Sequence, residues 1–208
     1  HNMDKTIELE KLAAEIAADT TLPLRESNLV FGEGNPDCGV MFIGEAPGMN
    51  EDRLKRPFVG RAGQLLDKLI EEIGWKRGDV YITNIVKRRP PENRDPTPEE
   101  IESYSPYLKR QIDIINPPVI APLGRFAMTH FLPEAKISKD RGKAFRVDGR
   151  IIFPLYHPAA ALRSTGVLLE LKADFAKLPD AISGKVSVTE VEAKKFPESE
   201  TPPQSGLF

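Results

Sequence analysis

Four short apolar runs, each followed by glycine or polar residues, constrain the fold of this sequence more than any other feature. The runs cover residues 40–43, 80–83, 119–123 and 151–155 and are nearly continuous in apolar side chains. Strands buried on both faces have this pattern, whereas half-exposed strands alternate apolar and polar residues. We therefore expect four strands inside a parallel sheet.

Helical patterns lie before and between these runs. Residues 4–18, 62–73 and 97–115 place apolar side chains at roughly helical spacing, and the last segment opens with Thr97-Pro98, which is typical of a helix start. Alternating strands and helices predict an α/β fold, a three-layer sandwich in which helices flank a central four-stranded parallel sheet.

The 208 residues are enough for one domain and a tail. We expect the domain to cover residues 1–183. Residues 184–208 are expected to form a flexible tail, because residues 187–203 are rich in Glu, Lys, Ser, Thr and Pro.

Composition excludes several classes of protein. Cys38 is the only cysteine, so neither an internal disulfide nor a four-thiolate metal site can form. His130 and His157 are too few for a histidine-based zinc site without carboxylates, and His130 lies in a plain helical stretch. No apolar run approaches the roughly 20 residues that span a bilayer, so we expect a cytoplasmic protein and no membrane partner. The net charge of -2 neither indicates nor excludes DNA binding.

Unusual residues follow every predicted strand. They are residues 44–48 (Gly-Glu-Ala-Pro-Gly), Asn84, residues 124–125 (Gly-Arg) and residues 156–158 (Tyr-His-Pro). In parallel sheets, ligands bind beyond the carboxyl ends of the strands, so these residues are candidates for one site.

Each candidate has a functional and a structural interpretation. A carboxylate in the first loop can orient water or be a solvated acid in a turn. Phe58 can stack on a base or fill the core. The amide of Asn84 can read a pyrimidine edge or satisfy a turn. His157 can bind an oxygen that gains charge, or cap a helix. Residues 87–96, basic at first and rich in proline, can follow a phosphate backbone or form a rigid connection.

Together and in order, four motifs resemble those of the uracil-DNA glycosylase superfamily. They are residues 44–48, 56–63 (Arg-Pro-Phe-Val-Gly-Arg-Ala-Gly), 81–84 (Tyr-Ile-Thr-Asn) and 157–163 (His-Pro-Ala-Ala-Ala-Leu-Arg). The chain is most similar to family 4, the thermostable-type prokaryotic and archaeal enzymes, from about residue 12 to residue 178. The resemblance implies a monofunctional DNA-repair enzyme that flips uracil out of DNA and hydrolyses its N-glycosidic bond.

The resemblance also implies roles for individual residues. Glu45, Asn84 and His157 are the expected catalytic residues, and Glu51 and Asp52 are alternatives to Glu45 as the acid that positions water. The residues expected to contact uracil are Ala46, Glu51, Phe58, Asn84 and His157. The residues expected to contact the rest of the DNA are Arg61, Arg88, Arg89, Leu162 and Arg163. Among these, Leu162 is expected to be the wedge that fills the space of the flipped base.

The sequence departs from family 4 in one respect. Those enzymes typically carry four cysteines that bind an iron–sulfur cluster, and the matching positions here are Asp19, Leu22, Arg88 and Tyr104. A cluster held by thiolates cannot form, and we expect no cofactor. Our hypothesis is that an Asp19–Arg88 ion pair and packing of Leu22 on Tyr104 hold the same junction.

Residues 204–208 (Gln-Ser-Gly-Leu-Phe) resemble the short peptide by which bacterial repair proteins bind the sliding clamp, although a short terminal match can also be meaningless. We expect uracil-containing DNA as the main partner, a monomer, and association with the nucleoid during repair. The alternatives are a glycosylase that also accepts hypoxanthine or xanthine, and a non-catalytic protein that binds uracil in DNA.

Overall fold

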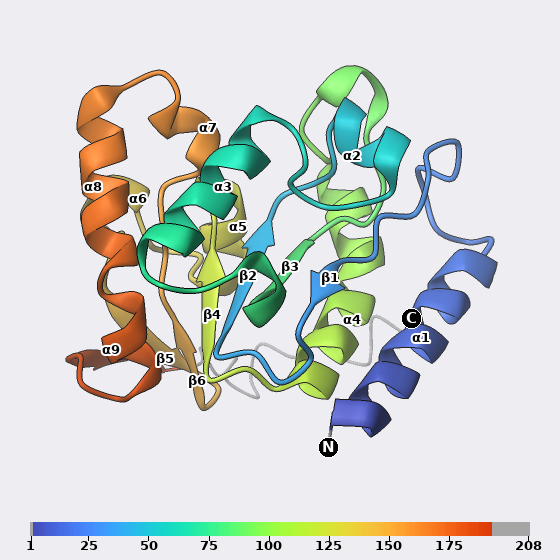
Figure 1. The fold of residues 1–208 in the computed structure, drawn as a ribbon. Coiled ribbons are helices and arrows are strands. Elements are labelled where there is room, and N and C mark those ends of the chain that lie inside the picture. The colour runs from blue at the N-terminus through green and yellow to red at the C-terminus, as the bar shows by residue number, and fades with distance from the viewer. Residues whose placement is uncertain (1, 193–208) are drawn as a thin grey trace, which may run out of the picture.

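A seven-stranded mixed sheet forms the centre of the protein (Figure 1). The structure, a computed structural model, describes residues 2–192. The strands lie in the order β1-β3-β2-β4-β6-β5-β7. Their bounds are β1 Glu33–Gly34, β2 Val40–Gly44, β3 Tyr81–Asn84, β4 Val119–Pro122, β5 Ala144–Val147, β6 Arg150–Ile152 and β7 Val188–Glu190.

The four expected strands form the parallel centre of this sheet. Phe42 on β2 is in register with Ile82 on β3 and with Ala121 on β4, and β4 pairs in parallel with β6. The expectation of four strands is corrected to seven, because β1 and β5 add antiparallel to β3 and β6, and β7 adds in parallel to β5. These extra strands are two to four residues long and carry charged side chains, so they give little periodic signal.

Strand β7 lies inside the segment that we expected to be tail from residue 184. Its backbone pairs with β5 between Ala144 and Val188 and between Arg146 and Glu190. The sheet therefore extends to residue 190, whereas residues 204–208 lie outside the described part of the chain.

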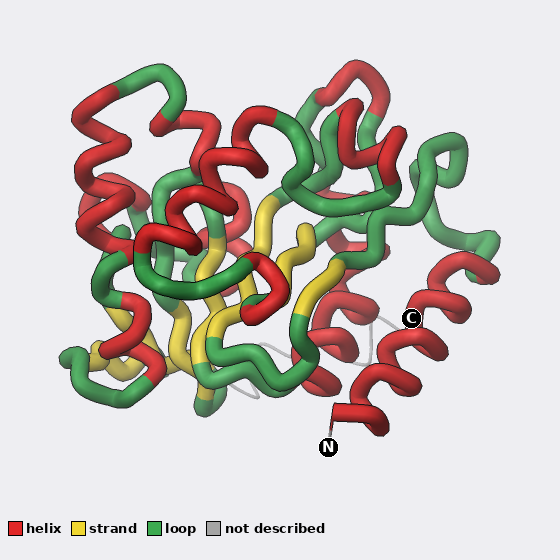
Figure 2. Tube along the Cα trace, viewed as in Figure 1, coloured by secondary structure: helices red, strands yellow, loops and turns green. Residues whose placement is uncertain are grey.

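Helices cover both faces of the sheet, as Figure 2 shows. Within residues 2–192, no helix combines the length and apolarity needed to cross a membrane. The bounds are α1 Asn2–Ala18, α2 Met49–Leu54, α3 Arg61–Glu72, α4 Pro98–Ile115, α5 Arg125–Phe131, α6 Ile137–Asp140, α7 Pro158–Ala161, α8 Thr165–Phe175 and α9 Leu178–Ile182, with 3-10 turns η1 Arg77–Asp79 and η2 Pro91–Asn93.

The side chains of β2 alternate between two hydrophobic cores. Met41 and Ile43 pack in the core formed with α1, α4 and α5, whereas Val40 and Phe42 pack in the core formed with α3, α8 and α9. All four are fully buried, which explains the continuous apolar run. The expected three-layer sandwich is thereby confirmed, and the three predicted helices correspond to α1, α3 and α4.

The junction between α1 and α4 differs from our hypothesis. Asp19 accepts hydrogen bonds from the Tyr107 hydroxyl at 2.5 Å and from the Thr21 hydroxyl at 2.6 Å, and it forms no ion pair with Arg88 among residues 2–192. Arg88 instead donates to the Tyr104 hydroxyl at 2.9 Å. The expected Asp19–Arg88 ion pair is therefore wrong, because each side chain has a nearer neutral partner on α4.

Leu22 and Tyr104 do share a hydrophobic core, as expected. The Tyr104 hydroxyl donates to the carbonyl oxygen of Pro23 at 2.7 Å while it accepts from Arg88. One buried phenol thus joins the segment after α1 to the segment after β3. The four positions supply no thiolate, so they do not fit an iron–sulfur cluster.

Candidate active site

The carboxyl ends of the central strands open onto one cavity of about 620 Å³. It is lined by residues that come from different segments of the sequence. The expected residues in its lining are Glu45, Ala46, Glu51, Phe58, Asn84 and His157, together with Arg61 and Arg163. The fold therefore brings the five residues expected at uracil, and Glu45, to one place.

Phe58 reaches the cavity because two glycines make room for it. It has a φ of 50°, in the left-handed region that side chains rarely adopt. A Cβ at Gly63 would lie 1.9 Å from the Phe58 carbonyl oxygen, and a Cβ at Gly44 would lie 2.6 Å from its ring. The ring is 7% exposed, and its centroid is 5.7 Å from that of His157. Phe58 and His157 thus lie next to each other in the cavity lining, and we call the part of the cavity that they line the slot.

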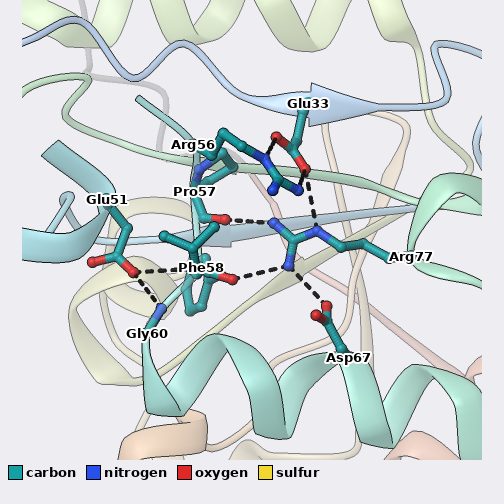
Figure 3. Close-up of polar contacts among 9 residues, drawn as sticks. Glu33, Glu51, Arg56, Pro57, Phe58, Gly60, Asp67 and Arg77 are labelled. Atoms are coloured by element: carbon teal, nitrogen blue, oxygen red, sulfur yellow. Dashed lines mark hydrogen bonds and ion pairs between the residues drawn. The ribbon is translucent and has the colours of Figure 1, made fainter. Parts of the chain in front are cut away.

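Glu51 holds the loop that carries Phe58. One carboxylate oxygen accepts from the backbone N–H of Val59 at 2.9 Å and of Gly60 at 3.0 Å (Figure 3). The other oxygen accepts from the backbone N–H of Gly48 at 3.0 Å. Asp52 lies outside the cavity lining and accepts from the backbone of Asn28 at 2.8 Å. Glu45 is the candidate carboxylate without such backbone bonds among the described residues.

Glu45 lies beside a second acid that sequence reasoning missed. Its carboxyl group is hydrogen-bonded to Asp95, which also lines the cavity. Partial burial and this second carboxyl group raise the pKa of Glu45 to about 7, against a smaller opposing effect of Arg125. Glu45 can therefore exchange a proton near neutral pH.

His157 is fixed in one orientation. Its Nδ1 accepts a hydrogen bond from the backbone N–H of Ala159 at 3.0 Å. Burial, assisted by the nearby charge of Arg163, lowers the pKa of His157 below its usual range. A neutral imidazole that accepts at Nδ1 carries its proton on Nε2, and this N–H can donate to an oxygen in the cavity.

Asn84 is 2% exposed and ends β3 against the slot. A Cβ at Gly44 would lie 2.4 Å from Asn84 Oδ1, so the amide and the first loop are in close contact. The main-chain oxygen of Asn84 accepts from Lys87 Nζ at 2.7 Å. Lys87 is fully buried, although sequence reasoning placed it at the basic start of a loop that could follow a phosphate backbone or form an exposed connection; lysine is rarely buried.

The expected DNA-contacting residues differ in accessibility. Arg61, Leu162 and Arg163 are exposed, and Arg61 and Arg163 lie at the cavity. Arg89 is half-buried and donates to Asn93, another residue of the cavity lining. Arg88 is 5% exposed and donates to Tyr104, so the structure does not present it to a phosphate.

Sequence reasoning also missed the far wall of the cavity. Asn93, Arg94 and Asp95 line it, although the sequence of their loop suggested either phosphate contacts or a rigid connection. Their approach to Glu45 depends on the path of residues 88–96, which turn through η2. The one signal in the sequence was the Pro90-Pro91 pair, which indicates a rigid path but not its direction.

These features define a class of protein: a single α/β domain with a cavity at the carboxyl edge of its sheet, lined by an aromatic ring, a side-chain amide, an imidazole and basic residues. The sequence profile of the uracil DNA glycosylase superfamily matches residues 31–178. A type-4 uracil-DNA glycosylase of Sulfurisphaera tokodaii is 46% identical over 182 residues, which cover 82% of this chain and 83% of the relative.

Two further relatives agree with this match. A type-4 uracil-DNA glycosylase of Saccharolobus solfataricus is 49% identical over 76% of this chain and 78% of its own. A type-5 uracil-DNA glycosylase of Pyrobaculum aerophilum is 31% identical over 72% of this chain and 76% of its own. The chain belongs to the uracil-DNA glycosylase superfamily, and its similarity is greater to these type-4 members than to this type-5 member.

Proposed function

We propose that this chain is a uracil-DNA glycosylase that flips uracil out of DNA and hydrolyses its bond to deoxyribose, leaving an abasic site. The observation that carries this proposal is the convergence of Glu45, Phe58, Asn84 and His157 on one cavity in a member of this superfamily. A protein that only bound uracil would not need a carboxyl group that titrates near neutrality beside the slot.

In this proposal, three residues bind the flipped base. Phe58 stacks on the ring of uracil, as aromatic side chains do on unstacked bases. The side-chain amide of Asn84 accepts from and donates to the polar edge of uracil. The Nε2–H of His157 donates to the uracil oxygen that gains negative charge as the bond breaks. Ala46 lies in the first loop beside this edge.

The reaction breaks the bond between C1′ of the sugar and N1 of uracil. The electron pair leaves with uracil, which becomes an anion, while positive charge develops on the sugar. The carboxylate of Glu45 stabilises that positive charge and accepts a proton as water adds to C1′. The His157 hydrogen bond and the Glu45 carboxylate thus act on opposite developing charges.

DNA binding in this proposal involves the rim of the cavity. Arg61, Arg89 and Arg163 contact phosphates, and Leu162, which is 42% exposed, fills the space that the flipped base leaves. The support is the exposure of Arg61, Leu162 and Arg163 and the position of Arg61 and Arg163 at the cavity. Arg89 is half-buried and donates to Asn93 of the cavity lining. Arg88 is omitted because it is buried.

The remaining expectations stay proposals: action as a monomer in the cytoplasm at the nucleoid, no cofactor, and clamp binding through residues 204–208. A clamp-binding peptide would raise the effective concentration of the enzyme at DNA. Deletion of residues 204–208 should abolish binding to a bacterial sliding clamp while it leaves uracil excision unchanged. Clamp binding that survives the deletion would exclude this role of the peptide.

The function is tested with a labelled oligonucleotide that contains one uracil, followed by alkaline cleavage. We expect cleavage at uracil by the native chain and none by an Asn84→Ala/His157→Ala double variant. Hypoxanthine and xanthine in the same sequence measure whether the slot accepts larger bases. Intact uracil DNA with retained binding would contradict a catalytic function.

A further inference from the structure

The guanidinium group of Arg77 faces the loop that carries Phe58 (Figure 3). It donates from Nη1 to the Phe58 carbonyl oxygen at 2.9 Å and from Nη2 to the Pro57 carbonyl oxygen at 2.5 Å. It also pairs with two carboxylates, Asp67 at 2.8 Å and Glu33 at 3.2 Å. Arg77 therefore ties the loop to helix α3 and to strand β1 at once.

The loop requires such a hold because Phe58 is in a strained conformation. A left-handed φ at a residue other than glycine is unfavourable and persists only where the surroundings fix it. Glu51 binds the N–H groups of Val59 and Gly60, while Arg77 binds the preceding carbonyl groups from the other side (Figure 3). Glu51 thus fixes backbone N–H groups of the loop, and Arg77 fixes its backbone carbonyl groups.

We propose that Arg77 is a positioning residue for base recognition: it holds the ring of Phe58 in the slot through the carbonyl groups of Pro57 and Phe58. The inference rests on the proposed stacking of Phe58 on uracil. Arg77 itself is absent from the cavity lining, so it acts on the base only through Phe58.

The chemistry of this position requires arginine. A planar guanidinium presents several N–H groups in fixed directions, so it can bind two adjacent carbonyls and two carboxylates together. The ammonium group of a lysine is a compact charge and cannot reach all four. The carboxylates of Glu33 and Asp67 provide charge balance, since the Arg77 side chain is only 18% exposed.

The test is a double-mutant cycle between Arg77 and Phe58, measured as single-turnover uracil excision. We expect Phe58→Ala to lower the rate about 30-fold and Arg77→Met to lower it about tenfold. The combined Phe58→Ala/Arg77→Met variant should match Phe58→Ala within about twofold, because Arg77 has no ring left to position. If the two substitutions acted independently, the rate losses of the two single variants would instead multiply in the combined variant.

Two further readouts separate positioning from loss of stability. Inhibition by free uracil should weaken about tenfold in Arg77→Met, whereas affinity for DNA with a tetrahydrofuran abasic analogue should be unchanged. All variants are compared below their unfolding transitions. Should Arg77→Met fail to fold, Arg77→Lys keeps the charge beside Glu33 and Asp67 and should still weaken uracil inhibition.

Arg56→Met is the matched control. Arg56 pairs with Glu33 at 2.7 Å in the same network but donates to neither loop carbonyl. We expect its excision rate to stay within about twofold of the native rate. Multiplicative losses in the double variant, or equal losses in Arg56→Met and Arg77→Met, would overturn the inference. No loss in Phe58→Ala would instead contradict the proposed stacking role of Phe58.

Discussion

Lys87 Nζ lies 2.7 Å from the main-chain oxygen of Asn84, and this contact joins a fully buried lysine side chain to the residue at the end of β3. Nζ also contacts Thr83 Oγ1 at 2.6 Å and Gln111 Oε1 at 2.5 Å. Burial lowers the pKa of Lys87 well below its usual range. Three acceptors nevertheless match the three N–H groups of an ammonium ion, whereas a neutral amine has only two.

We predict that Lys87→Met lowers single-turnover uracil excision about tenfold, because Asn84 loses the donor that fixes its backbone and buried acceptors are left unpaired. Rates are measured below the unfolding transition. Tyr81→Phe is the control, since it removes only the 3.2 Å bond between Gln111 and the Tyr81 hydroxyl. Equal losses in both variants would show that Lys87 affects stability alone.

The pH dependence of excision should follow Glu45. As a proton acceptor it must be ionised, so activity should rise with pH through about 7, the pKa to which burial and Asp95 raise it. Asp95→Asn removes the second carboxylate, so the rise in activity should move to lower pH. Arg125→Met removes a charge that lowers the pKa of Glu45, so the rise should move to higher pH. Single-turnover rates from about pH 5 to about pH 9 provide the measurement.

His157 should affect the excision rate but not its dependence on pH. Burial lowers its pKa, so it stays neutral where Glu45 titrates. His157→Gln should lower the rate by about 100-fold or more without moving the rise in activity with pH, because one donor to the leaving group is lost. If the rise of the excision rate with pH disappeared in His157→Gln but remained in Glu45→Gln, the titrating group would be the histidine.

Glu45 should also reduce stability at alkaline pH. Its pKa is about 7 in the folded chain and near 4.5 when unfolded, so its contribution is fully present below pH 4.5 and is lost as pH rises through 7. Glu45→Gln removes this loss. We predict that the free energy of unfolding of the variant exceeds that of the native chain by about 1–2 kcal/mol at pH 8, a value reduced to allow for the partial exposure of Glu45. At pH 4 the two should be equally stable. Urea unfolding at both pH values tests the sign.

Gly44 should be required for an open slot. A Cβ there would lie 2.4 Å from Asn84 Oδ1 and 2.6 Å from the Phe58 ring. We predict that Gly44→Ala lowers excision by about 100-fold or more, since either side chain must move out of position. Gly78→Ala is the control: nothing lies within 4 Å of its Cβ, and its stability should change by about 0.5 kcal/mol or less. Normal activity in Gly44→Ala would mean that the slot adapts.

The central sheet and the cavity were predictable from the sequence for the same reason. Continuous apolar runs such as residues 40–43 identify strands buried on both faces, and parallel strands bring their carboxyl ends to one edge. Residues at those ends, including Asn84 and His157, therefore had to converge. Phe58 was less certain from the residues alone, because its position depends on contacts with Gly44 and Arg77, which belong to other elements of the fold.

The charged contacts were not predictable in the same way. Asp95 meets Glu45 because of the path of a loop, and no periodic pattern encodes that path. Asp19 pairs with Tyr107 rather than Arg88 because α4 presents two tyrosines one turn apart, and each takes a different partner. Polar pairing depends on geometry within a few tenths of an ångström, whereas burial depends only on the apolar pattern.

The two tyrosines of α4 should contribute unequally to stability. The Tyr104 hydroxyl is buried and joins Arg88 to the Pro23 carbonyl, so Tyr104→Phe leaves two partners unpaired in the interior. We predict a loss of about 2–4 kcal/mol in the free energy of unfolding. Tyr107→Phe removes a bond to the partly exposed carboxylate of Asp19, which keeps its bonds to Thr21, and should cost clearly less than Tyr104→Phe.

Urea unfolding of both variants measures this difference. In a separate experiment, the native chain should be equally stable with and without an iron chelator. Both variants keep the aromatic ring, so their packing is matched and only the hydroxyl differs. Equal losses would mean that the buried phenol does not hold the junction. If Tyr104→Phe alone is destabilised, this junction is stabilised by the hydrogen bonds of a side chain at a position where the family 4 pattern has a cysteine.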